Sequence, residues 1–173
     1  MMVETDLRRN QAWIFFFKLF KNELIKILLM GAAGFTGLVF KAWAQAQGHE
    51  IFVLKADLTN KQVTVLKVAT ARPDAVVHLA AISFVGHADE SAINGVNVVG
   101  TTNLLHALNS LTNTPKCVLL ASTDNIYGSC EVSPISETQV AVPVNHYAMS
   151  KLAIELMAST FFRPVAYRYS API

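Results

Sequence analysis

Long apolar runs are scarce in this 173-residue chain. No segment reaches the roughly 18 uninterrupted apolar residues that a membrane-spanning helix needs. The nearest is the stretch from Trp13 to Met30, which three lysines and one glutamate interrupt. The uncharged run that overlaps its start, Asn10 to Phe17, is short for the core of a signal peptide. We therefore expect a soluble, cytoplasmic protein without a membrane span.

Cysteine and a surplus of one charge are also scarce. The 14 basic and 12 acidic residues leave a net charge of +2, whereas nucleic-acid-binding domains carry a clustered basic excess, so we expect no nucleic-acid partner. Cys117 and Cys130 are too few for a disulfide framework and fit a reducing compartment. The five histidines show no paired metal-ligand spacing, and His78 is interpreted as a packed strand residue, so no metal site is expected.

Short apolar runs alternate with helical segments along most of the chain. The expected strands are 25–30, 51–54, 75–79, 117–121 and 164–167, and the expected helices are 35–47, 60–71, 91–110 and 147–162. In the second of these segments, Val63 and Leu66 have the spacing of a helix. The strands are continuous apolar runs, which indicates burial on both faces of a parallel sheet. The pattern predicts a doubly wound α/β fold of the Rossmann type.

No repeat, low-complexity segment or Gly/Ser-rich linker divides the chain. We interpret it as an N-terminal extension, residues 1–24, followed by one domain, residues 25–173. The Phe-rich extension is open to three interpretations. It is a helix that packs on the domain, a membrane-surface anchor, or a segment with no role in the fold.

Three glycines, Gly31, Gly34 and Gly37, follow the first expected strand and open the first expected helix. Glycines there permit a tight turn and let backbone N–H groups approach a pyrophosphate at the helix N-terminus. The spacing is Gly-x-x-Gly-x-x-Gly, and a plain small-residue turn is the alternative. After the second strand, where an acid would bind the ribose of NAD, the chain has Lys55, which favours NADP unless Lys55 is a solvated loop charge.

Tyr147 and Lys151 are four residues apart on an expected helix and so share one face. An ammonium near a phenol favours the phenolate and lowers the pKa of the tyrosine, which suits it to proton transfer near neutral pH. Ser122 and Thr123, at the end of the fourth strand, can offer a hydroxyl to a substrate oxygen. Without that context the pair is an ordinary exposed helix face.

Seven segments together resemble the extended short-chain dehydrogenase/reductase superfamily, the NAD-dependent epimerase/dehydratase family of nucleotide-sugar enzymes. The segments are 31–37, 56–58, 72–81, 96–105, 121–128, 147–151 and 168–170. Within the superfamily, residues 80–85 and the short connection to Asp57 look most like GDP-4-dehydro-6-deoxymannose reductases. The resemblance implies that a C-terminal lobe for the nucleotide sugar is missing, so that residues 25–173 are an incomplete, truncated NAD(P)-binding Rossmann domain.

The resemblance also implies a role for each matching residue. The cofactor pyrophosphate is expected at Gly31, Gly34, Phe35, Thr36 and Gly37, the adenine at Asp57 and Leu58, and the ribose at Leu79, Ala80 and Ala81. Asn97 is expected near the site, and Ser83 and Asn125 are expected to face the sugar. Thr123, Tyr147 and Lys151 are the expected catalytic triad. Tyr147 would protonate the C4 oxygen as hydride arrives, and Lys151 would also hold the nicotinamide ribose.

These roles imply an NAD(P)-dependent oxidoreductase acting at C4 of a nucleotide-linked sugar, with reduction of a 4-keto-6-deoxy sugar favoured over 4-epimerisation or 4,6-dehydration. Asn125 stands where dehydratases place an acid, with Asp124 one position earlier, which counts against dehydration. A non-catalytic NADP-binding module and an inactive fragment are the alternatives, although such a module has no need of the triad. A homodimer through helices 91–110 and 147–162 is implied by the resemblance only.

Overall fold

Strand β1 (Lys26–Met30) lies in the middle of a parallel sheet, between β2 (Glu50–Val53) and β3 (Ala75–His78), and β4 (Cys117–Leu120) follows β3. The computed structural model describes residues 20, 23–83, 89–130, 135–136 and 138–161. Within them the order of strands is β2-β1-β3-β4. The first four expected strands are confirmed to within one residue at each end, and the expected strand 164–167 lies outside the described residues.

The expected helices are confirmed with the same precision. They are α3 (Phe35–Ala46), α4 (Lys61–Ala71), a continuous stretch of α5 (Glu90–Ile93), η1 (Asn94–Gly100) and α6 (Thr101–Asn109), and α7 (His146–Phe161). Segment η1 is π-helical, and a short 3-10 turn, η2 (Asp124–Tyr127), follows β4. No helix in the described parts of the chain is both long and apolar enough to cross a membrane.

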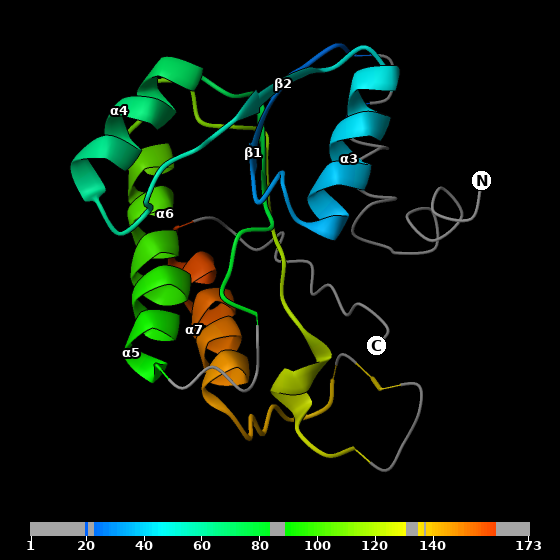
Figure 1. Cartoon of the computed structure of the whole chain (residues 1–173), viewed down its shortest axis with the longest axis vertical. Coiled ribbons are helices and arrows are strands. Elements are labelled where there is room, and N and C mark those ends of the chain that lie inside the picture. The colour runs from blue at the N-terminus through cyan, green and yellow to red at the C-terminus, as the bar shows by residue number, and fades with distance from the viewer. Residues whose placement is uncertain (1–19, 21–22, 84–88, 131–134, 137, 162–173) are drawn as a thin grey trace.

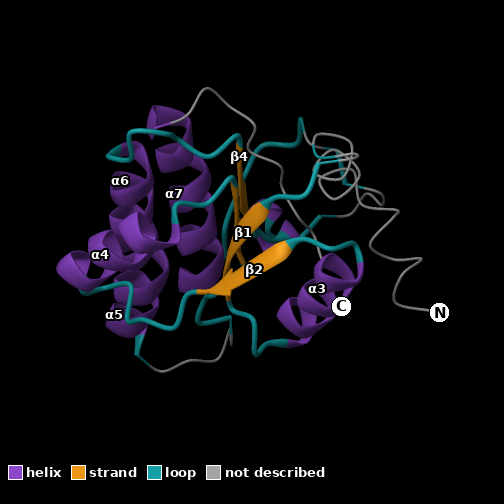
Figure 2. Ribbon diagram, turned by 90° about the horizontal axis from the view of Figure 1, so that it is seen from above, coloured by secondary structure: helices purple, strands orange, loops and turns teal. Residues whose placement is uncertain are grey.

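The sheet is covered on both faces, as the continuous apolar strands predicted. Helix α3 lies on one side of the strands, and α4, α5, α6 and α7 lie on the other (Figures 1 and 2). Alternate residues of β1 pack on opposite faces of the sheet. Ile27 and Leu29 pack with Phe40 of α3, whereas Leu28 and Met30 pack with residues of α4 and α6. The doubly wound α/β class is therefore confirmed.

Helix α4 forms where the helical spacing of Val63 and Leu66 predicted a helix. Its buried residues are Thr64, Val68 and Ala71, and Leu66 is 69% exposed. Thr64 tolerates burial because its hydroxyl donates to the Asn60 carbonyl at 2.9 Å. The neighbouring layer, rather than the local spacing of apolar residues, therefore decides which side of this short helix is covered.

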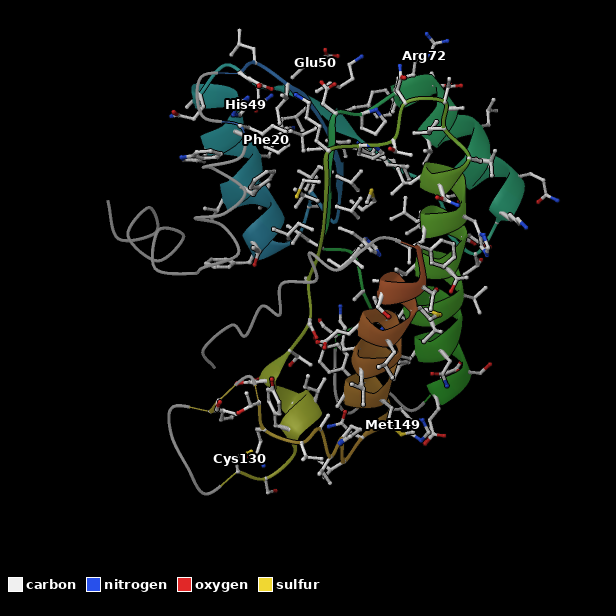
Figure 3. All side chains as sticks on the ribbon, turned by 180° about the vertical axis from the view of Figure 1, so that it is seen from behind. Phe20, His49, Glu50, Arg72, Cys130 and Met149 are labelled. Carbon is white, nitrogen blue, oxygen red and sulfur yellow. The ribbon has the colours of Figure 1, made fainter. Side chains whose placement is uncertain are left out.

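One residue of the predicted extension belongs to the core. Phe20 is 3% exposed and packs with Ile25 and Phe40 on the α3 side of the sheet, next to α3 in Figure 3. Glu23 forms an ion pair with Lys116, just before β4, with 2.7 Å between Oε2 and Nζ. Contacts thus cross the predicted boundary after residue 24, which stays a prediction. Residues 1–19 lie outside the described part of the chain.

Candidate functional site

The connections that leave β1 and β3 run to opposite faces of the sheet, α3 on one side and α5–α6 on the other (Figure 2). In open α/β sheets, ligands bind beyond the carboxyl ends of the strands at such a switch point. A cavity of about 720 Å³ lies there. Its lining residues are Gly31, Gly34, Phe35, Thr36, Gly37, Leu79, Ala80, Ala81, Ser83, Ala121, Ser122, Thr123, Asp124, Asn125, Tyr147 and Lys151.

All expected site residues except Asp57, Leu58 and Asn97 line this one cavity. Asp57 lies in an exposed turn, where its carboxylate accepts hydrogen bonds from the Thr59 hydroxyl (2.7 Å) and backbone N–H (2.9 Å). These bonds hold the pKa of Asp57 below its ordinary value. Leu58 is 7% exposed and packs in the α4–α6 layer. Their assignment to an adenine ring stays a prediction.

The three glycines of the β1–α3 turn meet different steric demands. Gly31 has φ +80°, and a Cβ there would lie 2.7 Å from the Ala80 nitrogen. A Cβ on Gly37 would overlap the Gly31 carbonyl and lie 2.8 Å from the Cα of Ala32. At Gly34 the nearest atom would be the Gly31 carbonyl oxygen at 3.5 Å, an ordinary contact. A side chain at Gly31 or Gly37 would therefore overlap the backbone, whereas a Cβ at Gly34 would be accommodated at the start of the helix.

The N-terminus of α3 has no side-chain cap and no acidic residue in its first turn. The first N–H groups of a helix have no intrahelical partner, and the helix dipole adds positive potential there. Phe35, Thr36 and Gly37 of this turn line the cavity. The residues present therefore fit the pyrophosphate of a dinucleotide.

Asn97 lies outside the cavity lining but holds two of its walls together. It is 1% exposed in η1. Its Oδ1 accepts from the Ile82 N–H (2.8 Å), and its Nδ2 donates to the Ile82 carbonyl and to the Ser150 hydroxyl oxygen (both 3.0 Å). The Ser150 hydroxyl donates to the Tyr147 carbonyl at 2.7 Å. Asn97 therefore connects the segment after β3 to the first turns of α7.

The three expected catalytic residues meet at the end of β4. Tyr147 and Lys151 occupy successive turns of α7, and the Lys151 Nζ lies 5.8 Å from the centre of the Tyr147 ring. The Lys151 ammonium donates to the Ala121 carbonyl at 2.8 Å. The Thr123 side chain is hydrogen-bonded to that of Tyr147. A phenol, a hydroxyl and an ammonium thus converge on one wall of the cavity.

The structure contradicts the expectation that Lys151 lowers the pKa of Tyr147. Burial raises the pKa of Tyr147, the Thr123 hydrogen bond lowers it, and the Asp124 carboxylate raises it further, with a net rise. Burial also lowers the pKa of Lys151 to about 8. The physical reason is that desolvation penalises the phenolate and the ammonium alike, and the ammonium here donates to a carbonyl rather than to the phenol oxygen.

Two further titratable side chains lie close to this wall. Glu155, one turn beyond Lys151, accepts a hydrogen bond from the Ser122 hydroxyl. The sequence interpretation missed Glu155, although the spacing 147, 151, 155 was a usable signal. His78 is 4% exposed, as a packed residue should be, with its Nε2 at 2.9 Å from the Thr101 hydroxyl oxygen. Burial and the nearby Lys151 charge lower the pKa of His78 to about 3, which keeps it neutral.

Comparison with known proteins gives the same picture. Residues 31–169 match the family model described as GDP-mannose 4,6 dehydratase. GDP-6-deoxy-D-talose 4-dehydrogenase of Aggregatibacter actinomycetemcomitans is 35% identical over 143 residues, which are 79% of this chain and 48% of that protein. RMD from Pseudomonas aeruginosa, complexed with NADPH, has a TM-score of 0.70 at 30% identity over 79% of this chain and 48% of its own. UDP-glucose 4-epimerase from Brucella ovis, in complex with NAD, has a TM-score of 0.74 at 29% identity over 84% and 51%.

The parallel sheet, the glycine turn and the Thr-Tyr-Lys group define a Rossmann-type domain of the extended short-chain dehydrogenase/reductase superfamily. Within it, the chain belongs to the GDP-mannose 4,6 dehydratase family, whose members are nucleotide-sugar epimerases, dehydratases and reductases. The chain spans about half the length of the curated relatives it matches.

Proposed function

We propose that this chain is the dinucleotide-binding part of an NAD(P)-dependent oxidoreductase that transfers hydride at C4 of a nucleotide-linked sugar. The observation that carries the proposal is that the glycine turn and the Thr123, Tyr147 and Lys151 side chains line one cavity. Reduction of a 4-keto-6-deoxy sugar is the favoured reaction. It is supported by similarity to proteins named GDP-6-deoxy-D-talose 4-dehydrogenase and GDP-6-deoxy-D-mannose reductase.

NAD(P) bound in this cavity would supply or accept the hydride. The raised pKa of Tyr147 keeps its side chain a phenol at neutral pH, which suits it to give a proton to the C4 oxygen during reduction. The Thr123 hydroxyl, already hydrogen-bonded to Tyr147, is placed to hold the same oxygen. Below about pH 8, Lys151 is an ammonium that can donate to a ribose hydroxyl as well as to the Ala121 carbonyl.

We propose NADP(H) as the favoured coenzyme. The supporting observation is Lys55, which is exposed two residues beyond the end of β2 and is available to a 2′-phosphate. Among similar solved structures, RMD is complexed with NADPH and UDP-glucose 4-epimerase with NAD. The ratio of the dissociation constants for NADPH and NADH, measured for the parent chain and for Lys55→Gln, tests this preference.

A nucleotide-sugar 4-epimerase is the second candidate, favoured by similarity to proteins named UDP-glucose 4-epimerase. There Tyr147 would first remove a proton from the sugar hydroxyl.

A homodimer through the stretch 90–109 and α7 is proposed as well. Three apolar side chains on these elements support it, since Val99 is 51%, Met149 54% and Leu156 65% exposed.

The test is calorimetric binding of NADPH and NADH to the 173-residue chain and to its Gly34→Asp variant. Gly34 has φ −75° and is the N-cap of α3, so aspartate fits sterically and is a favoured capping residue. The variant should fold at least as stably as the parent, while its carboxylate occupies the anion position and weakens binding about tenfold or more.

Gly34→Ser is the matched control, because serine also caps the helix but carries no charge. It should bind more tightly than Gly34→Asp. A parent chain that unfolds cooperatively but binds neither coenzyme contradicts the proposal. Coenzyme oxidation in the presence of a GDP-linked 4-keto-6-deoxy sugar, absent in Tyr147→Phe, then tests the reaction itself.

A further inference from the structure

Three side chains on successive turns of α7 contact three consecutive residues that follow β4. Tyr147 is hydrogen-bonded to the Thr123 side chain, and Lys151 donates to the Ala121 carbonyl at 2.8 Å. Glu155 accepts from the hydroxyl of Ser122, which stands between the other two. Residues at i, i+4 and i+8 of a helix lie along one face, so the three contacts form a single row.

Of these three contacts, only the one between Ser122 and Glu155 has no role in the proposed chemistry. Ser122 is 9% exposed and Glu155 is partly buried. A hydroxyl that donates to a carboxylate forms a charge-assisted hydrogen bond, stronger than one between neutral groups. The carboxylate therefore holds the backbone at Ser122 firmly against α7.

Displacement of Ser122 would move both of its neighbours. The Ala121 carbonyl is the acceptor that holds the Lys151 ammonium. Thr123 is the N-cap of η2, where its Oγ1 accepts from the Asn125 N–H at 3.2 Å, so its side chain is oriented by the same short segment. The Tyr147–Thr123 contact thus depends on where the chain lies at Ser122.

We propose that Glu155 is a positioning residue: by holding Ser122 it sets the place of the Thr123 hydroxyl against Tyr147 and of the Ala121 carbonyl against Lys151. The inference rests on the proposed function, which assigns proton transfer to Tyr147. Glu155 itself touches neither the sugar nor the coenzyme in this scheme.

The test is a spectroscopic titration of the Tyr147 phenol, measured as the difference between each variant and the same variant carrying Tyr147→Phe. The Thr123 hydrogen bond lowers the pKa of Tyr147. Glu155→Ala and Ser122→Ala should both weaken that bond and move the titration midpoint upward by about 0.5 to 1 pH unit. The double variant should move it no further than either single change, because both remove one contact.

Glu155→Gln separates the contact from the charge. Glutamine keeps a carbonyl oxygen for the Ser122 hydroxyl but loses the negative charge, whose loss alone would favour the phenolate. Its midpoint should therefore equal that of the parent chain or lie slightly lower, opposite in direction to Glu155→Ala. Glu50→Ala is the control for loss of an acid, since Glu50 lies at the other end of the molecule from Met149 of α7 (Figure 3) and should change nothing.

Folded Glu155→Ala and Ser122→Ala variants with the parental midpoint would overturn the inference, as would a Gln variant that behaves like Ala. Ser122→Ala removes one oxygen atom, so it keeps the test valid if Glu155→Ala fails to fold. Coenzyme binding by the parent chain is measured separately. Its absence would count against the proposed function, whereas an unmoved midpoint would count against the positioning role alone.

Discussion

Burial of the Lys151 ammonium destabilises the fold but places this residue in the lining of the cavity. It is 5% exposed, donates to the Ala121 carbonyl, and has a pKa lowered to about 8 by burial. Desolvation of the ammonium is the cause of this lowered pKa. A pKa below the ordinary lysine value means that the folded state binds the proton less well than the unfolded chain does. Burial of the Lys151 ammonium therefore destabilises the fold fully below about pH 8. This destabilisation decreases as the pH rises toward 10.5, the ordinary pKa of lysine.

Lys151→Met should stabilise the fold near neutral pH. Methionine keeps most of the apolar stem and removes the buried charge, a gain of about 3 kcal/mol that loss of the hydrogen bond to Ala121 reduces by about 1 kcal/mol. The free energy of unfolding in urea should rise by about 1 to 2 kcal/mol at about pH 7 and by less at about pH 9.5. Lys67→Met, at an exposed position of α4, is the control and should change little. A gain that is the same at both pH values would contradict the burial argument.

At the scale of the elements, the stretch from Glu90 to Asn109 does more than cover the sheet. Its middle part is π-helical, and a π-helical turn widens a helix locally. Asn97, within that part, makes three hydrogen bonds to Ile82 and Ser150. Ile82 follows the residues Leu79, Ala80 and Ala81, which line the cavity. The helix therefore fixes the wall of the site that follows β3.

Asn97→Leu should loosen that wall. The change leaves the N–H and C=O of the partly buried Ile82 without their side-chain partner, at a cost of about 2 to 4 kcal/mol. Amide hydrogen exchange at Ile82 should become faster than exchange in β1 of the same variant. Asn109→Leu, exposed at the end of α6, is the matched control. Unchanged protection at Ile82 would show that the segment is held by other contacts.

At the scale of the whole molecule, the core extends beyond the domain that the sequence delimits. Phe20 packs on the α3 side of the sheet with Ile25, Ile27 and Phe40. Of the described helices, α3 alone packs on this face, whereas α4 and α6 share the other (Figure 2). A large aromatic ring therefore contributes much of the apolar area buried there.

Phe20→Ala should destabilise the fold by about 3 to 5 kcal/mol, the usual cost of removing a buried phenylalanine ring. Thermal and urea unfolding measure it. Leu24→Ala is the control, because Leu24 is 78% exposed and close in sequence. Equal, small effects of both changes would place Phe20 outside the cooperative core and would favour the interpretation of the extension as a segment without a role in the fold.

Much of the fold and of the site could be predicted from local patterns. Continuous apolar strands indicated the parallel sheet, and Gly31, Gly34 and Gly37 indicated the turn at the carboxyl end of β1. Tyr147 and Lys151 could be assigned to one helix face from their spacing. These predictions succeed because periodicity and glycine placement are properties of the chain itself, independent of what packs against it.

Local patterns and the family resemblance thus predicted the elements, the fold class, the family and most of the lining of the cavity. Only the packed structure shows which face of α4 is buried, that Phe20 belongs to the core, that Asn97 holds Ile82, and that Glu155 contacts Ser122. That structure also shows the direction in which the pKa of Tyr147 shifts, because the shift depends on burial and on where the Lys151 ammonium points. Contacts between residues distant in the chain, and the desolvation they bring, arise only when the layers pack together.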